Sequence, residues 1–123
     1  MSKQAQYEIE LKNVEEQTLK EAVKTMAENL NLEVLDVKSF NAYGNRIPVR
    51  GTCIKAPNAS YPVDVYARDG EVCINGDEMD LNRYKSYNDR IKQFYSATEV
   101  KKVFGSEIVY DPETEKIEMM VAV

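Results

Sequence analysis

Two β-rich runs meet at Asp69-Gly70, and this pattern is compatible with few local structures other than a β-hairpin. Apolar side chains alternate with polar ones before this dipeptide, and a second β-rich run, residues 71–74, follows it. A type I′ turn needs positive φ at both central residues, and Asp-Gly is among the pairs that accept it. The segment therefore predicts a hairpin over residues 63–74, a unit that must lie in an antiparallel sheet.

The N-terminal third predicts a strand followed by a helix. Apolar and charged residues alternate over Tyr7–Leu11, as in a half-buried strand. Asn13 with Glu16 resembles a capping box, and Asn31 is a plausible left-handed end for the helix. Between them, one apolar stripe recurs at helical spacing: Leu19, Ala22, Val23, Met26, Ala27 and Leu30. We expect this stripe to be core.

The same kinds of sequence pattern predict the remaining strands and the second helix. We expect a strand at Leu32–Val37, then a loop or irregular edge over residues 39–51, and a strand that re-enters the sheet over Val49–Lys55. Ser86 with Asp89 resembles a helix start, and Gly105 is the expected stop, with Thr98 leaving open whether there is one helix or two. Residues 108–110 and Lys116–Val123 predict a C-terminal hairpin.

The order β-α-β-β-β-β-α-β-β predicts an α+β fold. Most strands are linked as hairpins, so we expect a mainly antiparallel sheet with two helices packed on one face. The length of 123 residues suits a single domain spanning 1–123.

Composition excludes several classes of protein. No apolar run approaches the roughly 20 residues that cross a bilayer, and the N-terminus lacks the apolar core of a secretory signal. We therefore expect a cytoplasmic protein without membrane contact. Cys53 and Cys73 fall in predicted strands and are expected to be small buried residues rather than a disulfide. The net charge of −5 argues against a basic nucleic-acid footprint.

One segment resembles a known family. Tyr87-x3-Ile91-x-Gln93-x-Tyr95-Ser96 is similar to a segment of an uncharacterised small-domain family, the hypothetical chloroplast reading frames of cyanobacteria and plastids. Upstream, Tyr61-x2-Asp64-Val65 leading to Asp69-Gly70-Glu71 agrees with the same element order. Phe94 stands where that family often has arginine. The resemblance implies a fold over residues 7–105 and carries no catalytic residue.

Catalytic and metal sites are not expected. The chain has no histidine, which removes imidazole triads and the common zinc sites. Neither cysteine has a histidine base, and no phosphate-binding glycine loop is present, so we expect no enzyme and no cofactor. Asp77, Glu78 and Asp80 could hold a divalent cation, but their spacing is not that of an EF-hand, and a solvated loop is the expected structure.

Six residues are candidate contacts for a ligand or partner. Two arginines in the segment 45–51 could grip a phosphate or carboxylate, or could pair with surface carboxylates. Cations interleaved with tyrosines over residues 83–95 could contact phosphate and stack a base, although helical spacing favours tyrosines that pack inward. The candidates are Tyr43, Arg46, Arg50, Arg83, Tyr84 and Arg90.

These patterns together predict a small acidic module that acts through protein contacts and not by catalysis. The contact would be an exposed sheet edge, with the last strand as a template for strand addition or a homodimer, or else the 43–51 loop. One alternative is a protein that senses or sequesters an anionic nucleotide. Another is a viral inhibitor of a host nucleic-acid enzyme, although a charge of −5 is modest for phosphate mimicry. Nucleic acid is not the expected partner.

Overall fold

The chain forms an α+β fold around a five-stranded antiparallel sheet, as predicted. The computed structural model describes residues 4–9 and 11–120, with side chains described for 11–77 and 81–120. The sheet order is β1 (Gln4–Ile9), β7 (Glu71–Asp77), β6 (Val63–Arg68), β5 (Thr52–Lys55) and β2 (Glu33–Leu35). β1 begins and ends earlier in the sequence than the predicted strand Tyr7–Leu11. β2 is shorter than the predicted strand Leu32–Val37.

The predicted hairpin is the centre of this sheet. Asp69 and Gly70 have φ values of 52° and 77°, so both central positions of the turn are left-handed. Val65 lies opposite Ile74, and Tyr66 lies opposite Cys73. Alternation therefore places the valines and Ile74 on one face and the polar residues on the other.

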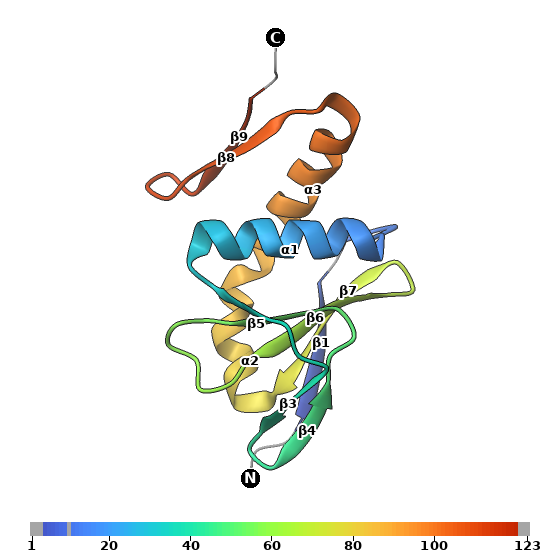
Figure 1. Cartoon of the computed structure of the whole chain (residues 1–123), viewed down its shortest axis with the longest axis vertical. Coiled ribbons are helices and arrows are strands. Elements are labelled where there is room, and N and C mark those ends of the chain that lie inside the picture. The colour runs from blue at the N-terminus through green and yellow to red at the C-terminus, as the bar shows by residue number, and fades with distance from the viewer. Residues whose placement is uncertain (1–3, 10, 121–123) are drawn as a thin grey trace.

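Two long helices, α1 (Glu16–Leu30) and α3 (Asn88–Phe104), pack on the first face of the sheet (Figure 1). The predicted stripe of α1 is buried here except at Leu30, which is partly buried. Ile91, Phe94 and Tyr95 of α3 join the same core. Asn31 and Gly105 end the two helices in the left-handed conformation, as predicted.

Both predicted N-terminal caps are wrong. Glu15 is the N-cap of α1, and no side chain caps the helix. Asn13 instead has φ 57°, within the turn in which Val14 N donates to Gly70 O. Ser86 Oγ donates to the Arg83 carbonyl, and α3 begins two residues later. The segment at Asn13 is thus held against the β6–β7 turn, and Ser86 bonds back to the preceding helix, so neither side chain caps the helix that follows it.

The acidic segment is not the loop that the sequence predicts. Asp77 ends β7 and is buried, and α2 (Glu78–Tyr84) follows at once, then a 3₁₀ turn (Lys85–Tyr87). Thr98 does not divide α3, because its hydroxyl donates to the Phe94 carbonyl inside the helix. The side chains of residues 78 and 80 lie outside the described set, so cation binding by this segment stays untested.

The segment predicted as an irregular loop is a second hairpin. β3 (Ser39–Ala42) pairs with β4 (Asn45–Pro48), and the turn has positive φ at Tyr43 (48°) and Gly44 (83°). Phe40, Ala42 and Ile47 form a small second core with Cys53 of the sheet. The short strands and a tyrosine in a left-handed turn position hid this hairpin from the sequence pattern.

The last two strands form a separate ribbon. β8 (Glu107–Asp111) pairs with β9 (Lys116–Met120), as predicted up to Met120, and residues 121–123 lie outside the described part of the chain. Figure 1 places this ribbon at one end of the long axis, beyond α1, and the β3–β4 hairpin at the other end. The ribbon is therefore not part of the main sheet.

Candidate functional site

The second half of α3 and the β8–β9 ribbon, residues 97–120, form what we call the C-terminal lobe. Within the described residues, five of the eight exposed large apolar side chains belong to it: Val100, Val103, Phe104, Val109 and Met120. Val103 is 73% exposed and Phe104 is 68% exposed. Exposed large apolar side chains gathered in one part of a small protein are candidates for contact with another molecule.

α3 exposes these residues because it is apolar on two sides. Ile91, Phe94 and Tyr95 face the core, whereas Val100 and Phe104 recur four residues apart on the opposite side. The predicted inward packing of tyrosines over residues 83–95 concerns the first side only, and the apolar second side was not predicted. The signal was present in the sequence, since a helix with a single buried face would carry polar residues at 100, 103 and 104.

A groove of about 550 Å³ lies between α3 and β9. Ala97 and Val100 line its helix side, and Ile117 and Met119 line its strand side. Lys92 and Lys116 also border it, which gives a mainly apolar groove two cationic side chains. A second cavity, of about 410 Å³, lies between α1 and the β2–β5 edge and carries Lys20, Lys24 and Asp36.

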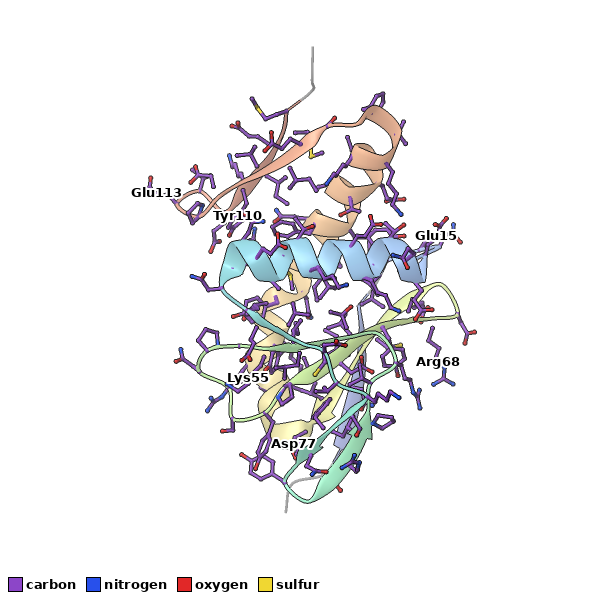
Figure 2. The ribbon with its side chains drawn as sticks, in the orientation of Figure 1. Glu15, Lys55, Arg68, Asp77, Tyr110 and Glu113 are labelled. Atoms are coloured by element: carbon purple, nitrogen blue, oxygen red, sulfur yellow. The ribbon has the colours of Figure 1, made fainter. Side chains whose placement is uncertain are left out.

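The ribbon is attached to the rest of the molecule through α3. Arg90 donates to the Glu115 carbonyl at 2.6 Å and lies 3.5 Å from its carboxylate. Tyr110 packs against Phe94, with ring centres 5.5 Å apart. Figure 2 shows Tyr110 on the side of the ribbon toward the helices and Glu113 at its outer end.

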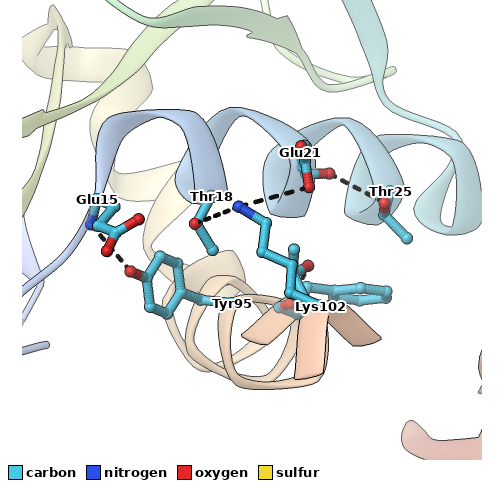
Figure 3. Close-up of polar contacts among 8 residues, drawn as sticks. Glu15, Thr18, Glu21, Thr25, Tyr95 and Lys102 are labelled. Carbon is cyan, nitrogen blue, oxygen red and sulfur yellow. Dashed lines mark hydrogen bonds and ion pairs between the residues drawn. The ribbon is translucent and has the colours of Figure 1, made fainter. Parts of the chain in front are cut away.

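Polar contacts fix α3 against α1 (Figure 3). Tyr95 Oη accepts the backbone N–H of Glu15 at 2.9 Å, and Lys102 Nζ donates to Thr18 Oγ1 at 2.6 Å. Lys102 also lies 3.9 Å from the Glu21 carboxylate. These contacts fix the face of α3 that is turned toward the core. The opposite face of α3 therefore has a fixed position in the lobe.

Three of the predicted contact residues lie on or beside the β3–β4 hairpin. Tyr43 is 44% exposed at the turn and meets the ring of Tyr61 edge-on, with centres 4.6 Å apart. Arg46 is exposed on β4. Arg50 lies 5.3 Å from the centre of the Tyr66 ring and 3.5 Å from its hydroxyl. Arg46 lies on β4 and Arg50 lies in the connection to β5, and the contacts described for Arg50 do not include Arg46.

The other three predicted residues lie elsewhere. Arg83 is exposed and donates to the Asn58 carbonyl. Tyr84 is buried, and its hydroxyl donates to the Tyr61 carbonyl at 2.8 Å and accepts from Ala56 N at 3.1 Å. Arg90 anchors the ribbon, as described above. The structure therefore distributes the six candidates over three regions and does not bring them into one site.

Buried polar groups lie on the sheet face under the β3–β4 hairpin. Asp64 is fully buried and accepts two backbone N–H groups, from Arg50 at 2.7 Å and from Gly51 at 3.0 Å. Burial raises the pKa of Asp64 above its ordinary value, and the two N–H groups oppose this shift. Burial, with the nearby Asp64 charge, raises the pKa of the Cys53 thiol to about 12.

The described residues hold no group of three or more acidic, cysteine or histidine side chains placed as metal ligands. Both cysteines are free and buried. No helix in the described part of the chain has the length and apolar character needed to cross a membrane. Comparisons with protein-family models, curated proteins and solved structures find no match to this chain, so the resemblance to the plastid reading frames stays a prediction.

Proposed function

We propose that this protein is a non-catalytic binding module that docks a protein partner on its C-terminal lobe. The observation that supports the proposal is the exposure of two successive large apolar residues, Val103 and Phe104, at the end of α3. Removing such side chains from water favours association, and aromatic anchors carry much of the energy at protein interfaces. The expected partner offers an apolar pocket or groove at the contact.

The chemistry of the described residues favours contact over catalysis. The chain has no histidine, and its two thiols are buried. The raised pKa of Cys53 keeps that thiol protonated at neutral pH, which makes it a poor nucleophile. Asp64 is occupied by two backbone N–H groups. These groups serve the fold.

The alternative, an anionic-nucleotide sensor, has less support. Arg50 lies over Tyr66, whereas Arg46 is on β4 of the hairpin, so no shared phosphate grip is visible in their described contacts. The α1 cavity has two lysines, but Asp36 lines it too, and Lys20 lies 3.9 Å from Glu16. Neither arrangement concentrates positive charge.

The proposal is tested with Val103→Asp and Phe104→Asp. Charge at the centre of an apolar contact should weaken partner binding by about 2 kcal/mol or more, roughly 30-fold in affinity. Immobilised protein first captures partners from its own host, and each captured partner is then titrated against every variant by calorimetry.

Val34→Asp and Val37→Asp are the matched controls, since these valines are 40% and 43% exposed but lie outside the lobe. The controls should bind like the unmodified protein. Equal loss of binding in the control and lobe variants, or no loss in any, would contradict docking on the lobe.

A further inference from the structure

Among the described strands, β9 pairs with β8 alone. The ribbon is a two-stranded sheet of β8 and β9, apart from the five-stranded sheet. Each strand of such a ribbon presents one edge of backbone N–H and C=O groups that can pair with another strand. Arg90 occupies the carbonyl of Glu115, so the open edge of β9 begins at Lys116.

The groove opens on the β9 side of the lobe. Ile117 and Met119 of β9 line its strand side, and Lys116, at the start of the same strand, also borders it. Ile117 and Met119 are half-buried toward α3, whereas Lys116, Glu118 and Met120 alternate with them and are exposed on the outer face. A strand that added to this edge would therefore also cover the groove.

The charges on β9 select a second copy of the same strand. In an antiparallel pairing about a two-fold axis at Ile117, Lys116 of each copy lies opposite Glu118 of the other. Opposite charges directly across two strands favour pairing, and the shift to a Glu118-centred register would place like charges opposite each other. Because both copies use the same surface in such a two-fold pairing, the assembly stops at two copies.

The same symmetry closes the groove. A two-fold axis perpendicular to the joined sheet keeps both α3 helices on one face, on either side of the β9–β9 junction. Ala97 and Val100, on the groove side of each helix, then face the helix of the other copy. Val103 and Phe104 lie beyond the groove residues, at the end of α3, and remain available to another partner.

We propose that two copies of this chain form a symmetric dimer through β9, with Ile117 at the axis and Lys116 paired with Glu118 across it. The dimer joins the two ribbons into one four-stranded sheet. It presents two copies of the apolar end of α3, so the module is bivalent.

Charge exchange on β9 tests the proposal by sedimentation velocity over a range of concentrations. Lys116→Glu and Glu118→Lys each place like charges opposite each other and should raise the dimer dissociation constant at least tenfold. An equimolar mixture of the two single variants should dimerise, because every cross-strand pair is then again of opposite sign. The double variant should also dimerise.

Glu113→Lys, on the exposed turn of the ribbon, is the matched control and should dimerise like the unmodified protein. A strictly monomeric unmodified protein, or a mixture that stays monomeric, would overturn the proposal. Dimerisation insensitive to either single variant would overturn it too. Partner binding by monomeric Lys116→Glu, measured as above, shows whether docking on α3 survives independently of the dimer.

Discussion

The buried carboxylate of Asp64 determines the conformation of the connection between β4 and β5. Its two oxygens accept the N–H groups of Arg50 and Gly51, which fixes the turn between β4 and β5. Gly51 approaches β6 so closely that an added Cβ would lie 2.1 Å from the Val65 carbonyl oxygen. The sequence pattern places Asp64 on a polar strand face, but its partners are backbone atoms whose position depends on the fold.

The raised pKa of Asp64 predicts a pH dependence of stability. The folded state binds its proton more tightly than the unfolded state, so between the ordinary value of 3.8 and the raised pKa the free energy of unfolding falls as pH rises. Relative to Asp64→Asn, the unmodified protein should therefore gain stability as pH is lowered through this window. Urea unfolding of both proteins at a series of pH values measures the difference.

Asp111→Asn is a control of opposite sign. Bonds from Glu113 N and the Thr114 hydroxyl hold the pKa of the exposed Asp111 carboxyl below its ordinary value. The stability that these bonds contribute is present above the pKa of the unfolded state, and it is lost as pH falls through the lowered pKa of the folded state. Parallel slopes for the two variants relative to the unmodified protein would contradict the assignment.

At the scale of elements, α2 closes the connection between β5 and β6. Tyr84 on α2 bonds the carbonyl of Tyr61 and the N–H of Ala56, and Arg83 bonds the carbonyl of Asn58. Three backbone groups of the connection are thereby satisfied by one short helix. Residues 75–85 show no helical periodicity, so this helix was not predicted. The side-chain contacts described above join it to backbone groups that lie far away in the sequence.

Tyr84→Phe should lower the free energy of unfolding by about 2–3 kcal/mol, because a buried N–H and a carbonyl each lose their partner. Chemical denaturation of the purified variant measures this. Tyr43→Phe is the control, since Tyr43 is 44% exposed and keeps its ring contact with Tyr61, and it should change stability little. Comparable losses in the two variants would count against the bridging role of the Tyr84 hydroxyl.

At the scale of the whole molecule, the lobe and the main sheet differ in how they are supported. β6 and β7 lie between other strands and carry much of the apolar core, whereas the ribbon has two strands that pack on α3. A two-stranded hairpin is marginal on its own, so its stability depends on its packing against α3 and the adjoining core. Local opening should therefore begin at the ribbon.

Hydrogen exchange checks this order. In the Lys116→Glu variant, which is expected to be monomeric, amides of β8 and β9 that pair within the ribbon should exchange faster than those of β6 and β7. Mass spectrometry of quenched samples resolves the segments, and the core strands serve as the internal reference. Equal protection of the ribbon and the central strands would show that the lobe opens only with the whole domain.

Local signals determined much of the fold. Asp69-Gly70, Asn31 and Gly105 marked a turn and two helix ends correctly, because positive φ is a property of the residue and its neighbours. The stripe of α1 and the alternation of β6 likewise follow from the periods of helix and strand. The α+β class follows from these elements, since each apolar face must be covered by another.

Only the tertiary structure decided where the polar and surplus apolar residues lie. Asp64 is buried by a hairpin whose strands are short, and the segments at Asn13 and Ser86, the predicted caps, make contacts with other parts of the chain instead. Val103 and Phe104 stay exposed at the C-terminal end of α3 although both are apolar. Burial is a relation between segments far apart in the chain, so no local pattern specifies it, and the candidate docking surface depends on that relation.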